Sequence, residues 1–201
     1  KIKDLINSNG IDCEIINHDK SEHKEKIAAE NNQETFGNLS SLLKCFEVAK
    51  KDQSDLIYFV EDDYLHYEHS LVDMLNTYER VSSQHKDEII VCPSDYPFNY
   101  MNNEKTNILI GSQQHWRTIT KMLCTFMISK KMFQKHIENF DKTCEKRHEP
   151  FEKYLNKILE SEIGISPIKS LAIHMTNVNS SYGLSPFIDI KKLWEENKID
   201  Q

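Results

Sequence analysis

Asp55-Leu56-Ile57-Tyr58-Phe59-Val60 is a short run of mostly apolar, strand-forming residues with polar residues on both sides. Such a run is typical of a central strand that is buried on both faces of a sheet. Three consecutive acidic residues, Glu61-Asp62-Asp63, follow it directly. Neighbouring carboxylates at the end of a buried strand repel one another and lose hydration, so a cation or hydrogen-bond donors must compensate them. The stretch therefore predicts both a core strand and an acidic site at its carboxyl end.

Amphipathic segments and further strand-like runs surround this stretch. An apolar stripe predicts a helix over residues 38–51, and apolar residues at i, i+3, i+4 and i+7 predict another over 68–84. A strand over 88–92 follows the second of these helices. The alternation of strands and helices favours an α/β fold with a mostly parallel central sheet.

The N-terminal residues continue the alternation of helices and strands, but they begin with a helix. They predict a helix over 1–9, a strand over 11–16 and a second helix over 22–31. Because an α/β domain usually begins with a strand, we expect a first strand to precede Lys1 in the natural protein, outside this segment.

The chain beyond Pro93 is more irregular than the part before it. No repeat, low-complexity tract or linker separates the two parts, so we expect a single domain over residues 1–201. The elements predicted in this second part are strands over 106–110, 124–128 and 171–176 and helices over 131–140, 150–160 and 189–197.

Composition argues against several classes of protein. The 201 residues carry a net charge of −7, which disfavours nucleic acid as a partner because a polyphosphate would be repelled. No apolar run is long enough for a transmembrane segment, and five scattered cysteines without a CxxC pair favour a reducing, cytoplasmic environment. The five glycines are too far apart for a phosphate-binding loop or a GxGxxG motif. The phosphates of a bound nucleotide would therefore be held by a metal ion or by side chains.

The acidic stretch itself suits a metal ion. In an extended chain Glu61 and Asp63 point to one side and Asp62 to the other, so two carboxylates face a hard divalent cation. Ligands of open α/β sheets bind outside the carboxyl ends of the strands, where we expect these residues. Mg²⁺ or Mn²⁺ bridging a diphosphate is the expected ligand. The alternative is a solvated acidic turn in which one carboxylate caps the next helix.

Val60-Glu61-Asp62-Asp63-Tyr64, at the end of an apolar strand, resembles the Asp-x-Asp type of motif in metal-dependent glycosyltransferases of the GT-A fold. The resemblance implies one Rossmann-like domain, with a nucleotide-sugar-binding half over about 1–92 and an acceptor-side half over about 93–201. It implies that Asp63 ligates the metal, while Glu61 and Asp62 contact the ribose or the donor sugar directly or through water.

The same resemblance implies a role for a histidine late in the chain. Such enzymes often use one as a further metal or diphosphate ligand, and His174 lies near the end of the last predicted strand. An imidazole suits Mn²⁺ better than Mg²⁺. The alternative is a hydrogen-bonded core histidine.

Two carboxylates are candidates for the catalytic base. Glu149 precedes Pro150, which we expect at the first position of a helix, so that Glu149 occupies the N-cap and stays ionised. An ionised carboxylate facing the acceptor suits an inverting transferase, in which it takes the proton of the attacking hydroxyl. The alternative is a helix cap without a catalytic role. Asp95 follows another strand and is the second candidate, in contact with donor or acceptor.

The remaining candidates would bind the donor. Trp116 and Arg117, on an expected loop, would stack on a sugar ring and pair with phosphate, although Trp116 is equally compatible with the core. Three polar residues follow the first predicted strand, where GT-A enzymes commonly bind the base, and a fourth opens the helix beside them. These four are Asn17, His18, Asp19 and Asn38, and turn formation is the alternative for them.

The favoured function is a metal-dependent glycosyltransferase of the inverting type. It would move a sugar from a nucleotide-diphosphate donor, preferably of the UDP type, to a saccharide or lipid-linked acceptor, with the metal offsetting charge on the departing diphosphate. A lipid-linked acceptor would bring a cytoplasmic enzyme to the inner face of a membrane. Two alternatives remain: a metal-dependent nucleotidyltransferase or phosphohydrolase, and a non-catalytic nucleotide-sugar-binding module.

Overall fold

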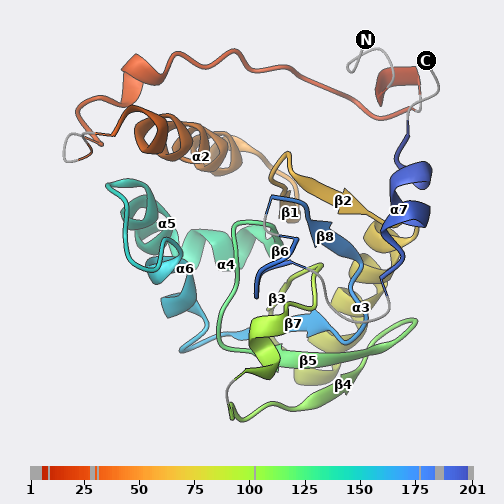
Figure 1. Ribbon diagram of the computed structural model, residues 1–201. Helices are drawn as coiled ribbons and strands as arrows, with labels where there is room; N and C mark the ends of the chain where they lie inside the picture. The colour runs from red at the N-terminus through yellow and green to blue at the C-terminus, as the bar shows by residue number, and fades with distance from the viewer. Residues whose placement is uncertain are drawn as a thin grey trace.

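The computed structural model shows a six-stranded sheet with helices on both faces (Figure 1). The strands lie in the order β1-β6-β3-β7-β5-β4. Their bounds are Leu56–Phe59 (β1), Ile89–Val91 (β3), Ile108–Ile110 (β4), His115–Ile119 (β5), Phe126–Ser129 (β6) and Ile163–Pro167 (β7). The structure describes residues 6–8, 10–27, 30, 32–101, 103–176, 178–183 and 188–198.

The sheet is mixed, and the expectation of a mostly parallel sheet is wrong. Among the pairs of the described sheet, β3 and β7 run parallel, whereas β1–β6, β3–β6, β5–β7 and β4–β5 run antiparallel. A turn of four residues joins β4 to β5, and a connection that short permits only antiparallel neighbours. Strands β5 and β7 were not predicted, so the alternation of helices and strands looked more regular than it is.

A second, two-stranded sheet lies beside the first. It consists of β2 (Tyr64–His66) and β8 (Ala172–His174), which pair antiparallel. The predicted strand over 171–176 is thus confirmed, but its partner is an unpredicted strand that follows the acidic turn. This pairing brings two segments that are far apart in the sequence to the same place.

Eight helical elements are described. Their bounds are Lys20–His23 (η1), Gln33–Lys51 (α2), Ser70–His85 (α3), Pro97–Tyr100 (η2), Lys130–Lys135 (α4), Ile137–Cys144 (α5), Lys153–Ile158 (α6) and Ile190–Glu196 (α7). Helix α2 begins earlier than predicted because the Asn32 side chain caps it, accepting hydrogen bonds from two backbone amides. The helix predicted over 131–140 is divided into α4 and α5 at His136.

The N-terminal predictions fared less well. Residues 11–19 form no strand, and Ile11 and Ile15 expose 61% and 60% of their surface, because no described strand lies beside them to bury these side chains. The short 3₁₀ helix η1 and a turn occupy residues 20–27, which overlap the first part of the helix predicted over 22–31. Residues 28, 29 and 31 and most of the helix predicted over 1–9 lie outside the described residues.

Each face of the main sheet has its own hydrophobic core. Ile90 packs with α2, α4, α5 and α6 in a cluster rich in phenylalanine, in which Phe46 and Phe59 meet edge to face at 5.2 Å. Its neighbours Ile89 and Val91 point the other way, into a cluster with α3 that includes the buried Trp116. Strand β3 is therefore buried on both faces. The expectation that the run at 55–60 forms such a central strand is wrong, because β1 lies at the edge of the described sheet and its first three residues are only partly buried. None of the described helices has the length and apolar character that a membrane span requires.

Lys130, at the start of α4, connects that helix to the C-terminal end of α2. Its Nζ donates hydrogen bonds to the carbonyl oxygens of Ala49, Lys50 and Asp52 at 2.5, 3.0 and 2.6 Å, at the C-terminal end of α2. These carbonyls have no partners within the helix, and the end of the helix dipole favours a positive charge.

We predict that Lys130→Met lowers the free energy of unfolding by about 1–3 kcal/mol, because it removes charged hydrogen bonds from the end of α2. Lys131→Met is the matched control, since the Lys131 side chain is 80% exposed and its only described ion pair is 3.9 Å long. Denaturant unfolding of both variants measures the difference. Equal stabilities would contradict the proposed role of Lys130.

Candidate functional site

The acidic turn after β1 lies against the end of β8. The pairing of β2 with β8 places Tyr64 opposite His174, and the backbone amide of Met175 donates to the carbonyl oxygen of Asp63 at 2.8 Å. The His174 Nε2 then lies 2.9 Å from Asp63 Oδ2, and the Tyr64 ring stacks on the imidazole with centroids 4.9 Å apart. The fold thus brings together two of the side chains that were predicted to bind metal.

His174 keeps one ring nitrogen unused. Its Nδ1 is buried and has no hydrogen-bond partner among the described residues, although the residue is 9% exposed. Because Nε2 is directed at a carboxylate, a neutral imidazole would donate its proton there and keep a lone pair on Nδ1. In the described part of the chain, no group of three His, Cys, Asp or Glu side chains is placed to hold a metal ion. Any metal here would need ligands from a bound substrate or from water.

Glu61 is the most strongly perturbed carboxyl of the turn. Its backbone amide donates to Thr125 Oγ1 at 3.0 Å, and that hydroxyl donates to Glu61 Oε2 at 3.3 Å. Burial, followed by repulsion from Asp63 and Glu152, raises the pKa of Glu61 to about 7. Asp62 is exposed, whereas Glu61 and Asp63 are partly buried. The turn therefore presents Glu61 and Asp63 to a shared, poorly hydrated space.

Sequence reasoning missed Glu152. It is the N-cap residue of α6, yet its side chain makes no capping hydrogen bond, and burial and the neighbouring Glu149 raise its pKa. The expectation that Glu149 caps this helix is wrong, because α6 begins at Lys153. Pro150 follows a cis peptide bond in the turn before the helix and is not its first residue. The sequence correctly predicts a carboxylate at the N-cap of this helix. It assigns the wrong residue, because it places the start of the helix three residues too early.

Asp95 and Arg117 come together as a second buried cluster. Asp95 is 1% exposed; its Oδ1 lies 3.7 Å from Arg117 Nη2, and its Oδ2 accepts a hydrogen bond from the Tyr100 hydroxyl. The Arg117 guanidinium also lies 4.0 Å from the centroid of the Tyr100 ring. Burial raises the pKa of Asp95 to about 6, although Tyr100 and Arg117 favour its charged form. Arg117 is on strand β5, so the loop expected there is wrong.

Trp116 is a core residue, and the expectation that it stacks on a sugar is wrong. Its side chain is fully buried in the cluster beneath α3. Gly111 faces the indole so closely that an added Cβ atom would lie 2.2 Å from the ring. The aromatic side chain that suited a sugar ring instead fills the space between β5 and α3.

Three of the residues predicted to bind the base also lie together. Asn17, His18 and Asp19 line a shallow cavity of about 680 Å³ with residues of α2, although they do not follow a strand. His18 Nε2 hydrogen-bonds the Ser40 hydroxyl at 2.6 Å, and Asp19 caps η1. Asn38 is an exposed residue within α2, not its first residue as expected, because the helix begins at Gln33.

An open groove connects this N-terminal cluster with the acidic turn. Its volume is about 630 Å³, and its walls are β1, one face of α2 and the segment that contains Ile16 and His18. It ends at Val60, the residue before Glu61, and most of its lining is apolar. Within the described chain β1 pairs on one side only, with β6, which leaves this edge of the sheet accessible.

Comparison with known proteins finds no relative of this chain. No protein-family model matches the chain, and neither a curated protein nor a solved structure does. The roles of the site residues therefore rest on their geometry and chemistry.

We predict that Glu61 makes the stability of the metal-free protein fall as pH rises. A carboxyl whose pKa is raised from 4.5 to about 7 on folding holds its proton more tightly in the folded state, so its contribution is full below pH 4.5 and is lost by pH 7. The loss is at most about 3 kcal/mol. Glu61→Gln should reduce this slope and be the more stable protein at pH 8.

Urea unfolding between pH 4.5 and 8 measures this effect. Glu160→Gln, which changes an exposed carboxyl of the same chemistry, should behave as the unsubstituted protein does. Identical slopes for the unsubstituted protein and Glu61→Gln would contradict the prediction.

Proposed function

We propose that this protein is a metal-dependent glycosyltransferase that acts in the cytoplasm on a nucleotide-diphosphate sugar. The observation that carries the proposal is the contact between Asp63 and His174 at the end of the groove along β1. It lies beside Glu61, whose pKa is raised. Oxygen and imidazole ligands meet there at the carboxyl end of the edge strand β1, and the carboxyl ends of strands are where open α/β sheets bind nucleotides.

The proposed metal is Mg²⁺ or Mn²⁺. Asp63 and His174 would hold it, with Glu61 on the same side as a further ligand or a partner through water. Two protein ligands are enough, since such ions usually keep waters and take other ligands from substrate phosphates. The mutual repulsion of the carboxylates fits a site that gains a cation on binding, and a cation shared by Asp63 and His174 would take the place of the hydrogen bond to Nε2. The bound ion would supply positive charge to the departing diphosphate.

The proposed donor lies along β1. Its nucleoside, preferably uridine, would occupy the apolar groove, with Asn17, His18 and Asp19 at one end and the diphosphate at Asp63. Glu61 and Asp62 would contact the ribose or the sugar. A volume of about 630 Å³ lies within the range of 300–1,000 Å³ that is usual for small-molecule sites. The acceptor would be a saccharide or a lipid-linked sugar.

Glu149 is the proposed base, in an inverting reaction. It is exposed, and its carboxylate has no hydrogen bond with another described residue, so it is free to accept a proton. Glu149 is close enough to Glu152 to raise the pKa of that residue. Glu152 in turn raises the pKa of Glu61, so these carboxylates lead from Glu149 to the acidic turn. Asp95 is the second candidate, but its carboxylate already accepts a hydrogen bond from Tyr100 and lies 3.7 Å from the Arg117 guanidinium. Arg117 accordingly acts on Asp95 and not on phosphate.

We predict that Asp63→Asn weakens the Mn²⁺-dependent binding of UDP by about 10- to 100-fold, because it removes the charge of a metal ligand. Isothermal titration calorimetry with and without Mn²⁺ measures the change. Asp87→Asn, at an exposed position after α3, is the matched control and should bind as the unsubstituted protein does. An unchanged Mn²⁺-dependent affinity of Asp63→Asn for UDP would contradict the proposed metal site.

We predict that Glu149→Gln lowers kcat by about 10²–10⁴-fold while leaving UDP affinity and the melting temperature unchanged, because an amide cannot accept the proton of the acceptor. UDP release from UDP-sugars in the presence of saccharide acceptors measures kcat. Glu145→Gln, an exposed residue of the same segment, is the control. A normal kcat would transfer the role of base to Glu152 or Asp95.

A further inference from the structure

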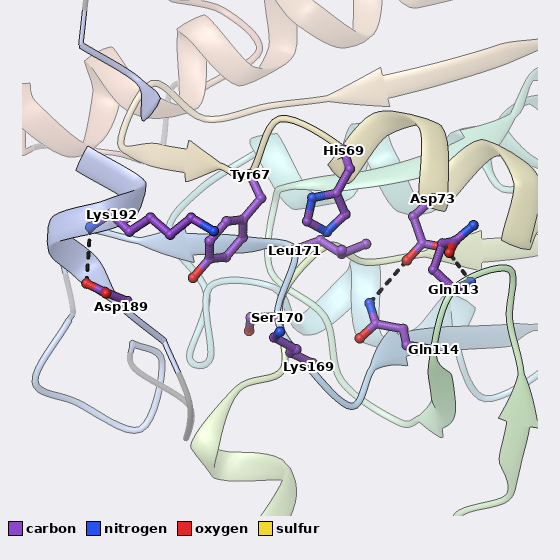
Figure 2. A pocket seen from close by; sticks show the side chains of 10 residues that line it. All are labelled: Tyr67, His69, Asp73, Gln113, Gln114, Lys169, Ser170, Leu171, Asp189 and Lys192. Atoms are coloured by element: carbon purple, nitrogen blue, oxygen red, sulfur yellow. Dashed lines mark hydrogen bonds between the residues drawn. The ribbon is translucent and has the colours of Figure 1, made fainter. Parts of the chain in front are cut away.

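A second cavity lies away from the acidic turn (Figure 2). It has a volume of about 330 Å³ and is formed by the start of α3, the turn between β4 and β5, the turn before β8, and α7. The two-stranded sheet separates it from the proposed metal site. Tyr64 pairs with His174 at one end of that sheet, and the backbone amide of Tyr67 donates to the Leu171 carbonyl oxygen at the other, three residues or about 10 Å along the strand.

One wall of the cavity is built around the buried Asp73. This residue is 2% exposed. Its carboxylate accepts hydrogen bonds from the backbone amide of Gln113 at 3.2 Å, the side-chain Nε2 of Gln114 at 3.2 Å and the Thr77 hydroxyl at 3.3 Å. Because the amide nitrogen of Gln114 is used for Asp73, its carbonyl oxygen is left to face the cavity, as Figure 2 shows. Asp73 thus fixes the orientation of an acceptor that would otherwise rotate freely.

The other walls combine donors with aromatic rings. Tyr67 and His69 lie on one side, with ring centroids 5.9 Å apart, and Lys169 lies across from them (Figure 2). Lys192 reaches in from α7, and Asp189 at the start of that helix adds an acceptor. The cavity therefore offers both donors and acceptors, together with two aromatic side chains.

The charges at the cavity do not favour an anion. Lys169 and Lys192 are positive, but Asp73 and Asp189 also line the cavity, and Glu196 lies 3.6 Å from the Lys192 ammonium. The carboxylates of Glu196 and Asp189, after burial, raise the pKa of Tyr67. A phosphate carries negative charge and has more acceptors than donors, so it would leave most acceptors of the cavity unpaired.

We propose that this cavity binds one pyranose ring of a neutral saccharide. Sugar hydroxyls donate and accept at once, which matches an oriented amide oxygen next to ammonium, imidazole and phenol groups. The hydrophobic face of a pyranose suits the aromatic side chains. The volume is at the lower end of the usual range for ligand sites, so it suits a single ring. The inference goes beyond the proposed transferase activity and holds whether or not the protein transfers a sugar.

Saturation-transfer NMR without metal or nucleotide tests the proposal. The probes are the methyl α- and β-pyranosides of glucose, galactose, mannose and N-acetylglucosamine, with inorganic phosphate as an anionic probe. We expect at least one pyranoside to bind, and Gln114→Ala to weaken it by about 3- to 10-fold through the loss of one hydrogen bond. Gln134→Ala, at an exposed position of α4, is the matched control.

Two further variants make each outcome decisive. Lys169→Ala leaves the contacts of Asp73 intact and should weaken the same pyranoside, unlike Lys146→Ala at an exposed position elsewhere. Asp63→Asn should leave pyranoside binding unchanged, because it alters only the proposed metal site. Binding that Asp63→Asn abolishes, or that neither cavity variant weakens, would overturn the proposal. So would phosphate binding in place of saccharide, or no binding by any pyranoside.

Discussion

The antiparallel pairing of β2 with β8 is the contact on which the whole candidate site depends. It comprises three residues on each strand, yet it fixes the acidic turn against His174, and at its other end the adjacent Tyr67 and Leu171 line the second cavity. The local chain alone would not hold Glu61, Asp62 and Asp63 in place, since a turn of like charges tends to separate. Backbone hydrogen bonds to a distant segment supply the restraint, and the stacking of Tyr64 on His174 strengthens it.

Three buried or partly buried carboxylates have different surroundings. Asp73 is surrounded by neutral donors, which stabilise its charge without a counter-ion. Asp95 faces an arginine and a tyrosine. Glu61 has one hydroxyl and otherwise faces other carboxylates, so its charge is the least compensated of the three. The uncompensated charge lies next to the histidine, and this difference distinguishes a site that can receive a cation from carboxylates that serve the structure.

Much of the local structure could be predicted from the sequence, and the reasons for the failures are physical. The apolar run at β1 and the apolar periodicity of α3 gave their elements to within one or two residues, because burial on a face leaves a strong pattern. Strand β2 is short and pairs with a segment more than a hundred residues away, whereas β7 contains Gly and Pro and pairs with β3 and β5, which are 45 to 74 residues away. Asp63 and His174 could be proposed as partners, but Glu152 could not, because its position depended on where α6 begins.

The accessible edge of β1 has a consequence for how the protein behaves at high concentration. A strand with a neighbour on one side only presents backbone amides and carbonyls that can pair with any other extended chain. Val60 at its end is 51% exposed, and the groove beside it is apolar. A ligand in the groove would shield the same backbone groups, so occupancy and self-association compete for one edge of the sheet.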